Sequence, residues 1–209
     1  MSRLGMLIDL SRCIGCDACT IACKAENTTP KEVLFARVLE KELPHNQKNK
    51  RLFIPILCNH CSDPPCLKNC PTRAISKRND GIVLVNPDKC SGEGTCVGAC
   101  PYGAMFLPDE NSGYSGDDLN PFEKLRYSVQ DPNHGTGSKT AMKCTFCYHR
   151  VDRGLEPACV ITCPVQCRIF GDLDDPNSKP SRYIDKKGAS PLPLLPSAGT
   201  KPNVLYFSE

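Results

Sequence analysis

Cysteine spacing constrains this chain more than any other feature of its sequence. The 209 residues include 16 cysteines, and all but one of them form four groups that each end in C-x3-C. The groups read C-x2-C-x2-C-x3-C (13–23), C-x2-C-x4-C-x3-C (58–70), C-x5-C-x3-C (90–100) and C-x2-C-x11-C-x3-C (144–163). Proline follows the last three groups, at Pro71, Pro101 and Pro164. Bacterial ferredoxins bind cubane iron–sulfur clusters with the run C-x2-C-x2-C-x3-C-P, so the pattern predicts four cluster sites.

Three other uses of cysteine fit the pattern less well. Disulfide frameworks are typical of small secreted chains, and the start MSRLGMLIDL does not read as a cleavable signal sequence. Structural zinc sites pair two C-x2-C knuckles across a longer loop, and repeated C-x3-C endings are not part of that arrangement. Haem attachment needs C-x2-C-H, which does not occur. Because thiols fill the sites, we expect His60 and His149 near the clusters or at the surface, not as ligands.

The composition and the motifs predict an α+β fold of two bacterial-ferredoxin-like modules, rich in loops and held together by clusters. Glycine and proline number 15 and 19, tryptophan is absent, and aromatic residues make up 6% of the chain. A chain with so modest an apolar core usually needs metals, clusters or disulfides for stability. No stretch approaches the ~18 apolar residues of a membrane span, so we expect none.

The second and third cysteine groups lie close together and predict an inner module over residues 51–108. Between them, Asn79-Asp80-Gly81 is a turn signal followed by a β-branched run at 82–85, which predicts a hairpin. In two-cluster ferredoxins the last cysteine of each group crosses to the other cluster. One cluster then takes Cys58, Cys61, Cys66 and Cys100. The other takes Cys70, Cys90 and Cys96, plus whatever replaces a missing fourth ligand.

The first and fourth groups form, by the same rule, a discontinuous outer module from residues 1–50 and 141–175. One of its clusters takes Cys13, Cys16, Cys19 and Cys163. The other takes Cys23, Cys144, Cys147 and Cys159. Sequence alone also permits the first group to pair with the second and the third with the fourth. The short hairpin between the second and third groups favours the former arrangement.

Two segments carry no complete cysteine motif. Residues 109–140 contain several Gly, Asp, Asn and Pro residues, and we expect a loop insertion that serves as a docking surface or as a solvated linker. Residues 176–209 contain repeated prolines and are expected to form an extended docking tail. Leu192, Leu194 and Leu195 are apolar for an exposed tail, so we expect them to pack on a partner or on the chain itself.

Taken together, the motifs resemble the four-cluster iron–sulfur subunit of molybdopterin oxidoreductases in the dimethyl sulfoxide reductase family, which includes polysulfide, thiosulfate and arsenate reductases. The resemblance covers most of the chain and is carried by the runs Ile8-Asp-Leu10 before Cys13-Ile-Gly-Cys16, Cys58-Asn-His-Cys61 with Pro64-Pro-Cys66, Cys100-Pro-Tyr-Gly103, Lys143-Cys-Thr-Phe-Cys147-Tyr-His-Arg150 and Gly154-Leu-Glu-Pro-Ala-Cys159. It implies the same pairing of inner and outer modules. It also implies a large catalytic subunit that holds bis-molybdopterin guanine dinucleotide, and it allows a membrane-anchor subunit.

Two positions depart from the family pattern. In the third group the usual second cysteine falls on Glu93. Either one iron is absent, which gives a 3Fe–4S cluster beside three 4Fe–4S clusters, or the Glu93 carboxylate binds the iron of a fourth 4Fe–4S cluster. An empty site, which leaves three clusters, is the remaining alternative. The second departure is Cys167, where the family usually has a small residue; we expect a buried inert thiol, with a substitute ligand as the alternative.

These features predict an electron-transfer subunit without a catalytic site of its own. The sequence has no nucleophile motif, no GxGxxG and no phosphate loop. The formal charge of +3 does not argue for a nucleic-acid partner, because four clusters with their thiolates add about −2 each and bring the total to about −5. We expect the chain to relay single electrons between a molybdopterin subunit and a quinone-linked or soluble redox partner. A free-standing polyferredoxin is the alternative, and the location is expected to be cytoplasmic, or periplasmic by export with a partner that carries the signal.

Overall fold

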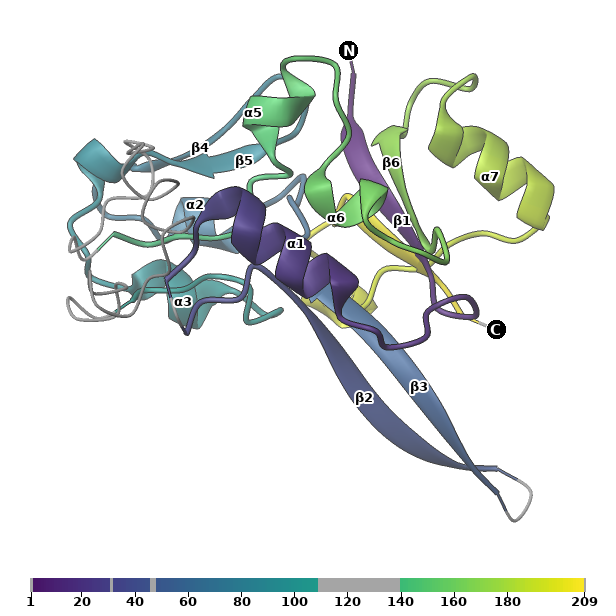
Figure 1. The fold of residues 1–209 in the computed structure, drawn as a ribbon. Helices are drawn as coiled ribbons and strands as arrows, with labels where there is room; N and C mark the ends of the chain where they lie inside the picture. Colours follow the sequence, from purple (N-terminus) through teal and green to yellow (C-terminus); the bar gives the residue numbers. More distant parts are fainter. Residues whose placement is uncertain (1, 31, 46–47, 109–139, 209) are drawn as a thin grey trace, which may run out of the picture.

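The fold is known from a computed structural model that describes residues 2–30, 32–45, 48–108 and 140–208. In these parts of the chain three small sheets and several short helices surround the cysteine groups (Figure 1). The mixture of helices and strands agrees with the expected α+β class. The expected loop insertion at 109–140 lies, apart from Thr140, outside the described residues.

A three-stranded sheet brings together segments from opposite ends of the chain. Its central strand β1 (Leu4–Asp9) pairs antiparallel with β6 (Arg168–Asp172) and parallel with β7 (Val204–Phe207). Three successive residues of β1, Met6, Leu7 and Ile8, are fully buried, so this strand is covered on both faces. The sheet therefore ties the start of the chain to its C-terminal part.

The other two sheets are hairpins. Strands β2 (Ala36–His45) and β3 (Lys48–Leu57) form a long antiparallel ribbon that projects from the body of the protein (Figure 1). The predicted boundary between residues 50 and 51 falls inside β3. Strands β4 (Ile75–Lys77) and β5 (Val83–Val85) form the hairpin predicted for the inner module, which is confirmed.

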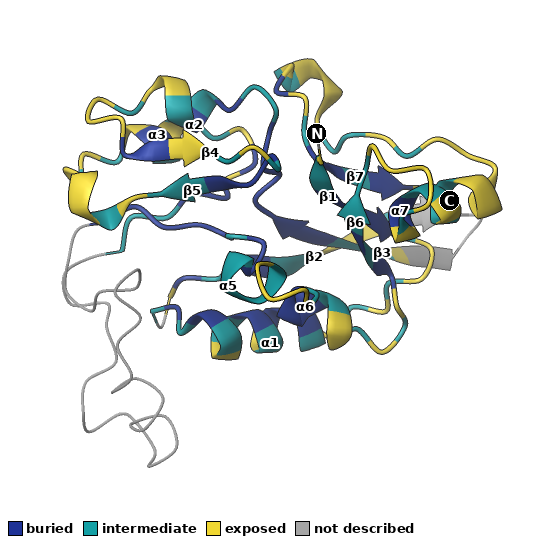
Figure 2. Ribbon diagram, turned by 90° about the horizontal axis from the view of Figure 1, so that it is seen from above, coloured by how far each residue is buried: buried dark blue, intermediate teal, exposed yellow. Residues whose placement is uncertain are grey.

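Short helices follow the cysteines. The longest of them near a motif is α1 (Ala18–Asn27), which buries Cys19, Thr20, Cys23 and Asn27 along one side and packs on α6 (Ala158–Ile161) (Figure 2). Positions i, i+4 and i+8 share one helix face, which is why this side points inward. The remaining short helices in the described residues are α2 (Pro65–Lys68), η1 (Pro87–Lys89), α3 (Thr95–Ala99), α5 (Tyr148–Val151) and η2 (Pro196–Ala198).

The expected extended tail at 176–209 is wrong for much of that segment. Helix α7 (Lys179–Lys187) lies against β6, and β7 completes the three-stranded sheet (Figure 1). The Ser178 hydroxyl caps the start of α7 by accepting from the Ser181 amide, Pro180 stands in the first turn where proline is tolerated, and Gly188 ends the helix with φ +64°. Leu194 packs against the core, whereas Leu192 and Leu195 stay exposed.

Candidate metal centres

The first set of sulfurs gathers in the outer module. Pro55, Val38 and the turn after Cys163 line a small pocket. The cysteines that line it are Cys13, Cys16, Cys19, Cys163 and Cys167. Within this set Cys19 is buried, whereas Cys16 is exposed, so one edge of the cavity faces the surface of this chain.

A second set of sulfurs lies in the same module. The Asn27 amide nitrogen is 3.4 Å from the Cys23 sulfur and 3.7 Å from the Cys147 sulfur, which joins residues 120 positions apart in the chain. Burial raises the pKa of Cys144, and the neighbouring sulfurs of Cys23, Cys58, Cys159 and Cys147 raise it further. The first cysteine group thus lies with the fourth.

The inner module contains the other two sets. A small pocket is lined by Cys58, Cys61, Cys66 and Cys100, together with Pro64, Val83 and Met105. Cys90 and Cys70 lie close enough to Cys96 to raise its pKa, although burial raises it more. The second cysteine group therefore lies with the third, and three sulfurs rather than four gather at the last site.

A repeated backbone turn explains why each C-P ending aims its sulfur inward. After Cys70, Cys100 and Cys163 the third following residue adopts a left-handed conformation, with φ +53° at Arg73, +55° at Gly103 and +50° at Gln166. This bend brings the amide of the fourth following residue back to the sulfur. The N–H···S distances are 3.2 Å from Ala74 to Cys70, 3.5 Å from Ala104 to Cys100 and 3.4 Å from Cys167 to Cys163. Proline fixes the first φ of the turn and so helps to preset it.

A second repeated turn places the second ligand position of each group. The residue before that position has positive φ in all four groups, at Gly15, His60, Gly92 and Phe146. In the first and third groups the residue after that position is also left-handed, at Asp17 and Gly94, and a helix begins directly after it.

Glu93 therefore stands at the same backbone position in the third cysteine group as Cys16 does in the first group. Both side chains lie on exposed residues. The Glu93 carboxylate accepts a hydrogen bond of 2.9 Å from the Ser91 hydroxyl.

The donor groups around the sulfurs suit anionic clusters. Further main-chain amides point at Cys58 from His60, at Cys90 from Ala141 and at Cys144 from Phe146, at 3.4–3.5 Å. Burial raises the pKa of Cys66 to about 12 and that of Cys159 to about 11, so a bound cation has to displace their protons. Thiolates that accept N–H···S bonds in a buried site are the ligand environment that iron–sulfur clusters use. The residues present therefore fit such groups.

Two buried cations accompany the sulfurs. The Arg168 guanidinium is 3.3 Å from the Cys19 sulfur and 4.0 Å from the Cys159 sulfur, and the residue is 2% exposed. The Lys143 ammonium is 1% exposed and donates to the carbonyl oxygens of Val83 and Cys144. No local sequence pattern marks these two cations as deeply buried.

His60, His149 and Cys167 lie close to the candidate ligands. His60 is buried, stacks on Phe146 at 3.8 Å between ring centroids, and accepts from the Val83 amide; its pKa is lowered by burial and by Lys143. His149 is partly exposed and pairs with Glu26 at 2.9 Å. Cys167 is buried, with its sulfur 3.5 Å from that of Cys163, and its hydrogen bond to Cys13 lowers the pKa of Cys13.

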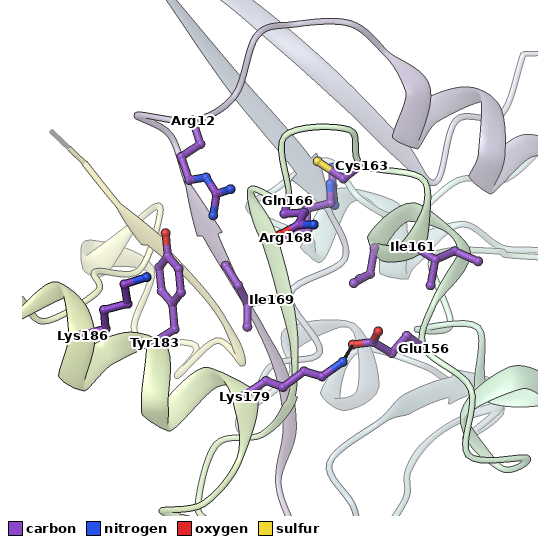
Figure 3. Close-up of a pocket in the computed structure, with 11 residues that line it drawn as sticks. Arg12, Glu156, Ile161, Cys163, Gln166, Arg168, Ile169, Lys179, Tyr183 and Lys186 are labelled. Atoms are coloured by element: carbon purple, nitrogen blue, oxygen red, sulfur yellow. Dashed lines mark ion pairs between the residues drawn. The ribbon is translucent and has the colours of Figure 1, made fainter.

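An open basic pocket lies beside the first set of sulfurs (Figure 3). Its wall on α7 contributes Lys179, Tyr183 and Lys186, and Arg12 faces them from the loop after β1. Lys179 pairs with Glu156 at 2.9 Å across the pocket. Cys163 and Arg168 also line the pocket, so this surface leads directly to the first set.

The described part of the chain offers neither a site for a single metal ion nor a helix that could span a membrane. Within 2–30, 32–45, 48–108 and 140–208, no three His, Cys, Asp or Glu side chains converge closely enough to hold a single metal ion. In the same ranges no helix is both long and apolar enough to cross a membrane.

Comparison with known proteins agrees with this donor set. A family model described as a 4Fe-4S dicluster domain matches residues 49–115 and 122–173. The arsenate respiratory reductase iron-sulfur subunit of Shewanella sp. (strain ANA-3) is 40% identical, over 98% of this chain and 96% of that protein. The B subunit of tetrathionate reductase from Salmonella typhimurium is 39% identical over 98% and 72% of the two proteins, and the B polypeptide of polysulfide reductase from Wolinella succinogenes is 38% identical over 97% and 92%. The chain therefore belongs to the family of iron–sulfur subunits of the dimethyl sulfoxide, polysulfide, arsenate and tetrathionate reductases.

Proposed function

We propose that this protein relays single electrons through four iron–sulfur clusters, between a molybdopterin catalytic subunit and a quinone-linked or soluble redox partner. The observation that carries the proposal is the gathering of the cysteines into four sets, each drawn from two groups that are separate in sequence. Bound clusters would supply reversible one-electron chemistry. The chain supplies the ligands, the N–H···S donors and the burial that adjust the potential of each centre.

Three of the four sets offer enough thiols for four ligands each. Cys13, Cys16, Cys19 and Cys163 would hold the first cluster of the outer module, and Cys23, Cys144, Cys147 and Cys159 the second. Cys58, Cys61, Cys66 and Cys100 would hold the first cluster of the inner module. Complete thiolate sets of this kind suit 4Fe–4S clusters.

The fourth set, Cys70, Cys90 and Cys96, would hold a 3Fe–4S cluster or a 4Fe–4S cluster that has Glu93 as its fourth ligand. The match between the turns at Gly92-Glu93-Gly94 and Gly15-Cys16-Asp17 supports a preserved pocket in which only one donor has changed. A carboxylate is a harder ligand than a thiolate and donates less charge to iron. Either outcome would raise the potential of this centre relative to an all-cysteine neighbour.

The relatives support a catalytic partner, since each is named as one component of a reductase. By resemblance that partner would hold bis-molybdopterin guanine dinucleotide and would lie nearest the first set, with the Glu93 site at the far end. A membrane-anchor subunit fits the same scheme. The complex would be cytoplasmic, or periplasmic if it is exported with a partner that carries the signal.

Metal analysis and spectroscopy of the purified protein test the proposal. We expect a brown protein that absorbs near ~400 nm, with about 15 or 16 iron atoms per chain and matching sulfide. About 12 iron atoms at full occupancy of the other sites would mean that the Glu93 site is empty. A colourless protein that contains zinc would refute the proposal outright.

Co-expression with the candidate catalytic subunit tests the partner. We expect the chain to be stable only in that complex, because α7 and the basic pocket offer a docking face beside the first set. A monodisperse, fully loaded monomer obtained from expression alone would favour the free-standing polyferredoxin instead.

A further inference from the structure

Arg168 touches two different sets of sulfurs. Its Nη2 is 3.3 Å from the sulfur of Cys19, which belongs to the first set, and its Nη1 is 4.0 Å from the sulfur of Cys159, which belongs to the second. The planar guanidinium can reach in both directions because its N–H groups form a rigid fork. The structure therefore joins the two sites of the outer module through one side chain.

In the described part of the chain, no carboxylate balances the charge of Arg168. Among the described residues no Asp or Glu pairs with it, and its Nε finds no hydrogen-bond acceptor. Burying an unpaired cation is costly, so the surrounding groups must compensate it. Burial alone would lower the pKa of Arg168, but the facing sulfurs of Cys159 and Cys19 outweigh that effect and raise it.

Lys143 is the other buried cation, and it is bound differently. Its ammonium donates to the carbonyl oxygens of Val83 and Cys144, with no sulfur among its hydrogen-bond partners in the described residues. It also lies nearer the inner module, where its charge lowers the pKa of Cys66. Lys143 thus offers a natural comparison for the effect of a buried charge that does not contact the first set.

We propose that Arg168 is a shared positioning and tuning residue that sets the reduction potentials of the two outer-module clusters together. The inference rests on the proposed function, since it requires clusters at both sets. Reduction adds one negative charge to a cluster, and a fixed cation at its ligands stabilises the reduced form. Because the site is buried, this interaction is weakly screened and acts on both centres.

Redox titration of the loaded complex, followed by electron paramagnetic resonance, tests the proposal. The variants are Arg168→Met and Arg168→Gln, which remove the charge, and Arg168→Lys, which keeps it. The two outer centres are assigned with Cys16→Ser and Cys23→Ser. Lys143→Met is the matched control, because it removes a buried cation whose hydrogen bonds in the described residues go to carbonyl oxygens and not to sulfur.

In Arg168→Met and Arg168→Gln we expect both outer centres to have lower reduction potentials. At a given solution potential, the ratio of reduced to oxidised cluster should fall at least tenfold. For a one-electron couple this corresponds to about 59 mV. The two inner centres should keep their potentials. Arg168→Lys should hold both outer centres within about threefold of the wild-type ratio, and Lys143→Met should leave the first-set centre unchanged.

A shift of one outer centre alone, or of neither, would overturn the shared role. An equal shift in Arg168→Lys and Arg168→Gln would overturn the role of the charge. If Arg168→Met fails to load its outer clusters, the Gln and Lys variants are judged by the same criteria. Fewer than four centres in the wild type would count against the proposed function, whereas four centres without the paired shift would count against this inference alone.

Discussion

Asp9 anchors α7 to the end of β1, and replacing it should loosen that helix. Its carboxylate is fully buried and accepts hydrogen bonds from Tyr183 at 2.5 Å, from Lys187 at 2.8 Å and from the Ser11 hydroxyl at 2.6 Å. Burial alone would raise the pKa of Asp9, but the bonds from Lys187, Ser11 and Tyr183 together lower it from 3.8 to about 2. This shift corresponds to about 2 kcal/mol of stabilisation of the charged form.

The Asp9→Asn variant should therefore open α7 about 30-fold more often, since about 1.4 kcal/mol corresponds to a factor of ten. Hydrogen exchange of the α7 amides at pH 7 measures this opening. Asp185→Asn is the control, because Asp185 lies on the same helix and is exposed. The folded-state pKa of Asp9 lies below its unfolded value, so the contribution is complete above about pH 4 and disappears as the pH falls through about 2.

Unchanged exchange of α7 in Asp9→Asn would refute this reasoning. So would equal acceleration in Asp9→Asn and Asp185→Asn, since it would show that the helix responds to any loss of charge. Faster exchange throughout the protein would point to a global loss of stability and not to the release of α7.

Three further predictions concern the clusters and the partner. Glu93→Cys should convert one centre to an ordinary 4Fe–4S signal at lower potential in a redox titration followed by electron paramagnetic resonance; four unchanged centres would show that Glu93 does not face a cluster. Arg73→Gly should slow the thermal loss of cluster absorbance, because glycine relieves the cost of φ +53°, of the order of 1 kcal/mol, and Arg73→Val should do the opposite. Arg12→Glu should slow association with the catalytic subunit, most strongly at low salt, whereas Lys68→Glu on α2 should not.

The site was more predictable from the sequence than the rest of the fold, because its geometry is local. The C-P endings and the C-x2-C spacings each define a turn of a few residues, and the structure repeats those turns at Cys70, Cys100 and Cys163. The hairpin between β4 and β5 was also foreseeable from its Asn-Asp-Gly turn. Whether the gathered cysteines bind clusters in these sets stays a prediction.

The C-terminal segment differs from the extended tail that its prolines predict, because proline is compatible with the first turn of a helix. Ser178 is a typical N-cap residue, Pro180 stands in the first turn where proline is accepted, and Gly188 is a typical C-cap residue. Together these three residues predict a helix over 179–187. The pairing of β7 with β1 could not be foreseen, since parallel strands that are distant in sequence carry no local mark of their partner. The deep burial of Arg168 and Lys143 is likewise a tertiary property that appears only when the sulfur sets come together.

The discontinuity of the outer module has a consequence for biogenesis. All cysteines of the first inner-module set have been synthesised once translation has passed Cys100. The set that contains Cys13, Cys16 and Cys19 is complete only after Cys163 has been synthesised. Strand β1 likewise finds its partners only after β6 and β7 have been made. If the outer module binds clusters as proposed, iron delivery to it would be a late event in the maturation of each chain, since domains fold in the order in which their parts emerge. During that interval four nascent thiols near the amino terminus, those of Cys13, Cys16, Cys19 and Cys23, have no partner sulfurs, so oxidants in the cell threaten the newly made protein more than the finished one.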